Sequence, residues 1–243
     1  MIVSYNNKIV SYNNNWVDKV DALPSDTIRL LYKPGVTPTF EKGTAVQVSQ
    51  DPNIWDLTYY SSIHGWTLLL QGHEDLIEVL GANSSRIINL SNIFRGCTSL
   101  SRVALFDTSN VTNMGSMFNE CTSLTSVPLF DTSKVTFMGN MFVRCTSLTS
   151  VPLFDTSKVT YMGGMFIDCT SLTSVPLFDT SNVTNVDGMF SSCYNVESGA
   201  LALYIQMSTQ ANPPTNHNIT FRNCGRDTVT GAAELAQIPS DWK

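Results

Sequence analysis

Charged residues are scarce in this 243-residue chain, and the basic ones are outnumbered. Asp, Glu, Lys and Arg make up 14% of the sequence, against roughly 25% in an average globular protein. The 14 Lys and Arg residues face 20 Asp and Glu residues and form no basic run. Because proteins that bind nucleic-acid phosphates carry clustered Lys and Arg, we expect no nucleic acid as a partner.

Long apolar runs are missing too. The longest candidate, Trp66–Leu70, is far shorter than the roughly 18 residues of a membrane span, so no membrane insertion is expected. The N-terminus, MIVSYNNKIVSYNNNW, lacks the charged region, apolar stretch and cleavage site of a signal peptide. We expect either a protein that never passes a secretion channel or one whose signal has been removed.

Histidine is rare, and no catalytic motif is present. The three histidines are His64, His73 and His217, and none lies beside a Ser or Cys in a recognisable nucleophile motif. P-loop, G-x-S-x-G, H-E-x-x-H and paired-carboxylate signatures are missing as well. We predict that the protein is not an enzyme and uses no cofactor.

What the sequence does contain is a repeat of 24 residues. The unit reads D-T-S-[NK]-V-T-x-M-G-x-M-F-x-x-C-T-S-L-T-S-V-P-L-F, and its copies become irregular towards both ends, as expected where a repeat stack meets solvent. We divide the chain into an N-terminal β-rich arm and cap (1–68), a repeat region (69–197) and a C-terminal cap (198–243). Strands are predicted over 27–33, 44–49, 54–60 and 219–223, and helices over 198–210 and 230–237.

The period lies within the range of leucine-rich repeats. We expect Leu124, Val127 and Leu129 to enter the core from a short strand and residues 115–121 to form a helical turn. The coils then stack about 4.8 Å apart through backbone hydrogen bonds. The predicted fold is an α/β-type, leucine-rich-repeat-like, right-handed solenoid of about six coils.

Two columns of chemically active side chains follow the period. Small buried free thiols explain the first column, although a disulfide between adjacent coils or a metal site is an alternative; Cys224 falls outside it. The carboxylates of the second can hold Ca²⁺, but Asx turns to backbone N–H groups two residues on are the simpler interpretation. We predict buried free thiols in the cysteine column, Asx turns in the aspartate column, and no metal site in either. The columns are Cys97, Cys121, Cys145, Cys169 and Cys193, and Asp107, Asp131, Asp155 and Asp179.

Two surfaces are candidates for binding a partner. Alternation beyond Leu129 turns one row of rings outwards, into an apolar stripe larger than monomers usually expose; a bend at the following Asp turns the same rings inwards, and the sequence leaves both open. The row consists of Phe106, Phe130, Phe154 and Phe178.

The second candidate surface consists of positions at which the copies differ. The two middle units carry apolar residues where the outer units carry Asn or Ser, and solvent alone gives no reason for that change. Lysines also replace Asn there. We predict that these residues contact a partner: Phe137, Tyr161, Val143, Ile167, Lys134 and Lys158.

The unit F-D-T-S-N-V-T-N-M-G-S-M-F-N-E-C-T-S-L-T-S-V-P-L resembles the BspA-like leucine-rich repeats of bacterial surface proteins, a group also called DUF285. The resemblance covers residues 83–193. The segments TIRLLYKPGVTPTFEKGTAVQVS and TGAAELAQIPSDW resemble caps found with such repeats in gut bacteria and their phages. The family implies adhesion or recognition, not catalysis.

Bacterial members of that family normally carry an export signal and an anchor, so the resemblance favours a phage virion component. The expected role is that of a tail fibre or appendage that binds a bacterial surface glycan or protein, or other virion proteins. A bacterial cell-surface adhesin that binds host tissue is one alternative. A structural spacer docked by its N-terminal arm is another, and a homo-oligomer remains open.

Overall fold

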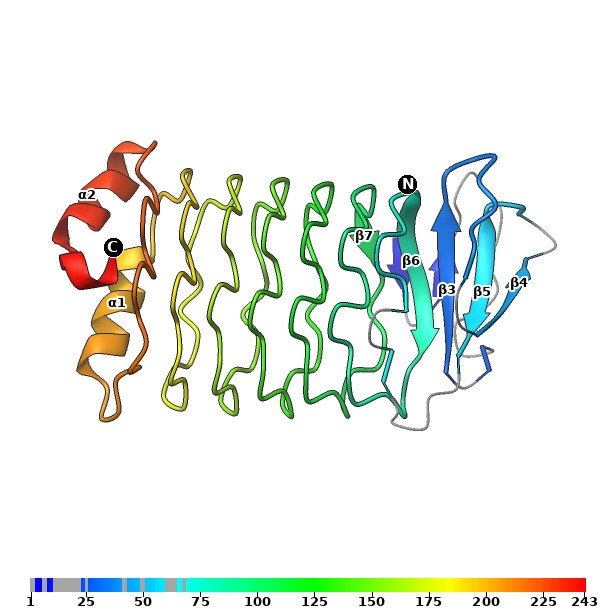
Figure 1. The fold of residues 1–243 in the computed structure, drawn as a ribbon, viewed down its shortest axis with the longest axis horizontal. Helices are drawn as coiled ribbons and strands as arrows, with labels where there is room; N and C mark the ends of the chain where they lie inside the picture. The colour runs from blue at the N-terminus through cyan, green and yellow to red at the C-terminus, as the bar shows by residue number, and fades with distance from the viewer. Residues whose placement is uncertain are drawn as a thin grey trace.

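The structure, a computed structural model, describes residues 3–5, 8–10, 23–24, 26–40, 43–48, 51–59, 65–66 and 69–243. Figure 1 shows an elongated molecule, with a sheet at one end, stacked coils in the middle and helices at the other end. Strands β1 (Val3–Tyr5) and β2 (Lys8–Val10) pair antiparallel within the predicted N-terminal arm. His64 lies outside the described residues.

A five-stranded sheet, in the order β4-β5-β3-β6-β7, forms the N-terminal end. All six residues of the central strand β3 are buried, and the guanidinium of Arg29 within it donates two 2.7 Å hydrogen bonds to Asp56. The three strands predicted between residues 27 and 60 are confirmed. The sheet consists of β3 (Thr27–Tyr32), β4 (Thr44–Gln47), β5 (Ile54–Thr58), β6 (Leu76–Asn83) and β7 (Arg102–Val103).

The sheet continues into the repeat region. Strand β3 pairs antiparallel with β5 and β6, whereas β6 pairs in parallel with β7, one coil further along the chain. Strands β6 and β7 of the first coils are therefore also part of the sheet that covers the N-terminal end of the stack. The division of the chain at residue 68 stays a prediction.

Backbone hydrogen bonds join each coil to the next, which shows a repeat fold. The N–H groups of Met114, Ser116 and Phe118 donate to carbonyls one coil further on, over 2.9–3.0 Å. One column of parallel bridges keeps the 24-residue period. Figure 1 shows the coils that these bridges join, stacked side by side. These bridges join Gly65 to Asn89, Asn89 to Asn113, Asn113 to Phe137, Phe137 to Tyr161, and Tyr161 to Asn185.

The predicted helical turn over residues 115–121 is wrong. Met117 N–H does donate back to the Met114 carbonyl, over 3.2 Å. However, Ser116 and Glu120 have φ angles of 54° and 64°, in the left-handed region that a right-handed helix cannot pass through. Each coil turns its corner with successive tight turns, which let alternate N–H groups reach the next coil.

Two α-helices and a 3₁₀ turn close the C-terminal end. Helices α1 (Ala200–Thr209) and α2 (Val229–Gln237) confirm the predicted helices, and η2 (Ser240–Trp242) follows. Among the residues that the structure describes, no helix is long and apolar enough to cross a membrane.

Aromatic rings form the axis of the core. Neighbouring rings in this column lie nearly parallel, with centroids 5.0–6.0 Å apart. Because a single coil cannot enclose a core, each coil depends on its neighbours for burial. The column consists of Phe94, Phe118, Phe142, Phe166, Phe190 and Phe221.

Phe221, the last member of that column, belongs to a coil that departs from the 24-residue period. Residues 219–223 were predicted to form a strand, but Asn216 bridges Asn185, and Phe190 N–H donates to the Thr220 carbonyl over 2.8 Å. Segment 216–224 therefore forms one more coil of the stack. Helix α1 is inserted before it, so its distance along the chain from the preceding coil is longer than 24 residues. Cys224 is buried at the end of the cysteine column rather than outside the pattern.

Candidate binding surface

The first candidate surface, the row of phenylalanines, faces the core instead of the solvent. The four phenylalanine rings expose at most 6% of their surface, so the outward stripe is wrong and the rings face inwards. The leucine before each ring is exposed instead, and this includes Leu129, which was predicted to be core. The inward rings are Phe106, Phe130, Phe154 and Phe178.

A tight turn causes the inversion. Phe130 N–H donates to the Pro128 carbonyl over 3.0 Å, and Phe178 donates to Pro176 over the same distance. A hydrogen bond two residues back closes a three-residue turn, which breaks the strand alternation. The turn directs Leu129 outwards and Phe130 inwards. We call the exposed row, Leu105, Leu129, Leu153 and Leu177, the leucine stripe.

The second candidate surface centres on two stacked rings. Phe137 and Tyr161 occupy bridged positions of adjacent coils, and their ring centroids lie 4.8 Å apart at an interplanar angle of 12°. Both residues are half-buried. We call Phe137 and Tyr161 the ring pair.

The backbone beneath the ring pair is glycine for a steric reason. A Cβ atom on Gly115 would lie 2.6 Å from the Phe137 ring, and one on Gly139 would lie 2.6 Å from the Tyr161 ring. In the outer coils the same column holds asparagine, and Asn113 Oδ1 accepts a 2.8 Å hydrogen bond from Gly115 N–H. This column of bridged positions therefore accepts two kinds of residue: an asparagine that forms an Asx turn, or an aromatic ring that packs over glycine.

The other variable residues lie on the same two middle coils. Val143 and Ile167 are half-buried in adjacent coils, since Arg144 N–H donates to the Ile167 carbonyl over 2.8 Å. Lys134 and Lys158 are exposed, and Lys134 Nζ donates to Asn110 Oδ1 over 2.7 Å. Whether these residues bind a partner stays a prediction.

All six cysteines are buried free thiols, as predicted for the column. Each thiol in the column donates to a carbonyl of the preceding coil, as Cys121 does to Phe94 and Cys145 to Phe118, both over 3.1 Å. Burial raises the pKa of Cys97 to about 12. Thiols that stay protonated are poor nucleophiles and metal ligands.

The aspartate column forms the predicted Asx turns. Asp107, Asp131 and Asp155 each accept a 3.0 Å hydrogen bond from the backbone N–H two residues on. Hydrogen bonds from the Ser133 side chain and backbone lower the pKa of Asp131, so it stays ionised. Among the described residues, no three His, Cys, Asp or Glu side chains gather as a metal site requires.

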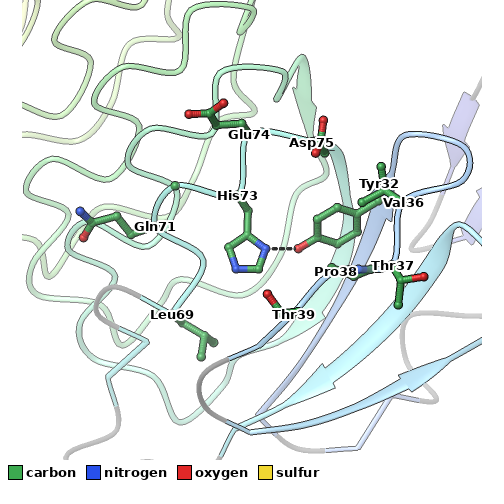
Figure 2. Close-up of a pocket in the computed structure, with 11 residues that line it drawn as sticks. Tyr32, Val36, Thr37, Pro38, Thr39, Leu69, Gln71, His73, Glu74 and Asp75 are labelled. Carbon is green, nitrogen blue, oxygen red and sulfur yellow. Dashed lines mark hydrogen bonds between the residues drawn. The ribbon is translucent and has the colours of Figure 1, made fainter.

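A cavity of about 740 Å³ lies between the C-terminal end of β3, with the residues that follow it, and residues 69–75. Figure 2 shows Tyr32 Oη beside His73 Nδ1, 2.5 Å away, and the Phe40 ring stacks on His73 at 5.5 Å. Burial raises the pKa of Tyr32, so its phenol stays protonated. The repeat pattern predicts His73 at an end unit of the stack, but nothing in the sequence predicts this cavity.

Two solved structures are similar to parts of this chain. No curated protein matches the chain. The crystal structure of a leucine-rich repeat protein of T. pallidum is similar, with 22% identity and a TM-score of 0.49, covering 71% of this chain and 74% of that one. One from Eubacterium ventriosum has 20% identity and a TM-score of 0.41, covering 58% and 35%.

A family model supports the assignment of a repeat fold. Residues 88–202 match the model described as "Mycoplasma protein of unknown function, DUF285". The match spans the bridged positions from Asn89 to Asn185, the cysteines from Cys97 to Cys193, the Asp column, and the core rings from Phe94 to Phe190. The predicted resemblance to the BspA-like leucine-rich repeats, the DUF285 group, is therefore confirmed over residues 88–202 of the repeat region.

Proposed function

We propose that this chain is a non-enzymatic recognition protein that binds its partner through the variable residues of the middle coils. The ring pair is the observation that carries the proposal. Phe137 and Tyr161 are half-buried apolar groups at positions where the same scaffold accepts asparagine. The repeat does not require rings there, and interface cores are enriched in aromatic residues.

The surroundings of the ring pair fit recognition better than catalysis. The thiols are buried and protonated, and the aspartates are held in turns. Lys134 and Lys158 add positive charge three residues before each ring, to a chain whose net charge is −6. An anionic or hydroxyl-rich surface polymer matches this mixture of rings and ammonium groups.

Our specific version is a phage tail fibre or appendage that binds a surface glycan or protein of a bacterium. The alternatives are a bacterial adhesin that binds host tissue and a spacer that docks to other virion proteins. The DUF285 match supports the general role, a surface or interaction protein, for all three. The three versions place the protein in the virion, at the cell surface or within a larger assembly.

Binding to whole cells separates the three versions. The fluorescently labelled full chain is incubated with a panel of intact gut bacteria and with epithelial cells, and bound protein is counted by flow cytometry. Strain-selective binding to bacteria supports the phage version, and binding to epithelium alone supports the adhesin. Binding to neither contradicts cell recognition and supports the spacer.

The finer architecture is also a proposal. We propose a right-handed solenoid of about six coils, with a β-rich N-terminal cap and a mixed C-terminal cap. The column of parallel bridges and the helices at the far end support it. A crystal structure tests it, and a left-handed path of the chain from one coil to the next would contradict it.

A further inference from the structure

The leucine stripe is an apolar surface that the recognition proposal does not use. Its side chains are exposed by 61%, 59%, 62% and 53%, at the same position of four successive coils. Three half-buried prolines, Pro128, Pro152 and Pro176, precede the last three leucines and widen the row. Contiguous exposed apolar patches of this kind mark interaction sites, because isolated apolar residues are normal but aligned ones are not.

The two borders of the stripe differ in hydrogen-bonding character. On one side, two residues after each leucine, lie the exposed carboxylates of Asp107, Asp131, Asp155 and Asp179. On the other side, three residues before each leucine, lie donors: Arg102 in the first coil, then the exposed Ser126, Ser150 and Ser174. The carboxylate border can therefore only accept hydrogen bonds, whereas the other border can donate them.

Both borders repeat with the stripe, so they have the same spacing along the stack. A two-fold axis parallel to the stack places leucine against leucine and brings the acceptor border of each copy against the donor border of the other. Asp107 then faces Arg102 of the second copy. A two-fold axis across the stack would place carboxylate against carboxylate, which costs energy. The stripe is thus complementary to itself in one orientation.

We propose that the leucine stripe binds a second copy of this chain, forming a parallel two-fold dimer with the coils in register. Homodimers with two-fold symmetry use the same patch on both subunits, as this geometry requires. The ring pair takes no part in the proposed contact. Failure of the dimer test would therefore leave the proposal for the ring pair standing.

Sedimentation velocity of the full chain tests the proposal. We expect a dimer at micromolar concentration, and the double variant Leu129→Ser, Leu153→Ser should weaken dimerisation by about 100-fold or more, since four leucines leave the interface. Val229→Ser is the matched control, because Val229 is 90% exposed on α2, outside the stripe. A wild-type monomer at about 100 µM, a higher oligomer, or a double variant that dimerises like the wild type overturns the proposal.

Cysteine cross-linking tests the orientation and does not depend on weakening the contact. Leu105→Cys and Leu177→Cys are made singly and oxidised with copper phenanthroline, while the native thiols are shielded by burial. In the in-register dimer, the new cysteine of each variant forms a disulfide with the same cysteine of the second copy. An antiparallel dimer would cross-link only a mixture of the two variants, and that result would contradict the proposed geometry.

Discussion

The Phe137 ring lies parallel to the Tyr161 ring, at a centroid distance of 4.8 Å and an angle of 12°. The stack runs along the repeat axis, so each ring lies close to glycine backbone of its own or a neighbouring coil. The ring pair is therefore part of the packing of the middle coils as well as a candidate for contact with a partner. Stability and binding must be measured separately to distinguish these roles.

A double-mutant cycle measures the packing role. Gly115→Ala should lower the free energy of unfolding by about 2 kcal/mol, because the new Cβ would overlap the Phe137 ring. In the Phe137→Asn background the same change should cost less than about 1 kcal/mol, since the ring is gone. Urea unfolding of the four proteins gives the coupling, and equal costs in the two backgrounds would show that the ring does not dictate glycine.

The buried thiols predict a loss of stability at alkaline pH. Burial raises the pKa of Cys97 and Cys224 to about 12, well above the value of an exposed thiol. Ionisation therefore occurs more readily in the unfolded chain, and the free energy of unfolding should fall as the pH rises from about 9 to about 12. Urea unfolding as a function of pH measures this fall, and an unchanged free energy across this range would contradict it.

The thiols also predict slow modification. Ellman's reagent at pH 8 should leave the six thiols of the native protein unmodified for hours and modify all six at once in denaturant. The denatured sample is the control for reagent and thiol content. Rapid reaction of the native protein would show that the column opens in solution.

The Asx turns predict the opposite dependence on pH. Hydrogen bonds from serine lower the pKa of Asp131, Asp155 and Asp179, so their contribution is present above a pH of about 4 and is lost as the pH falls below it. Asp131→Asn keeps the accepting oxygen and should be nearly neutral, whereas Asp131→Ala should cost about 0.5 kcal/mol. Thermal unfolding at pH 7 compares the two, and equal costs would exclude the turn as the reason for aspartate.

The C-terminal cap depends on one tryptophan. Trp242 is 5% exposed, and its ring stacks on His217 with centroids 4.2 Å apart. It also lies against Phe221, the last ring of the core column. Trp242→Ala should lower the free energy of unfolding by about 3 kcal/mol, because the end of the column is uncovered. Val229→Ser is the control, and a loss of less than about 1 kcal/mol for Trp242→Ala would show that the cap does not close the stack.

The sequence predicts the elements that depend on the period alone. The cysteine column, the Asx turns and the buried Val127 follow from identical residues in identical places. Leu129 and Phe130 could not be assigned in the same way, because the turn after Pro128 overrides strand alternation, and that turn depends on backbone geometry. The prediction of a helical turn over residues 115–121 was wrong for a similar reason. The left-handed φ of Ser116 cannot be recognised from the pattern of hydrophobic residues.

The missed last coil did leave a signal. Residues T-F-R-N-C at 220–224 match M-F-N-E-C at 117–121, but the spacing of 31 from Cys193 hid the match. The inserted helix α1 explains that spacing. The cavity beside His73 left no signal, because it forms between segments far apart in the chain. The positions of the variable residues follow from comparing the copies, whereas the stacking of Phe137 on Tyr161 required the structure.

The measurement that tests the account most directly compares cell binding of three proteins. The wild type, the variant Phe137→Asn, Tyr161→Asn and the control Val229→Ser are labelled, checked for folding, and counted on the bacterial strain that binds the wild type best. Asparagine suits the column, as Asn113 and Asn185 show. The account predicts that the ring variant loses at least about 90% of the bound signal while the control retains it. Undiminished binding by a folded ring variant would contradict recognition through the middle coils.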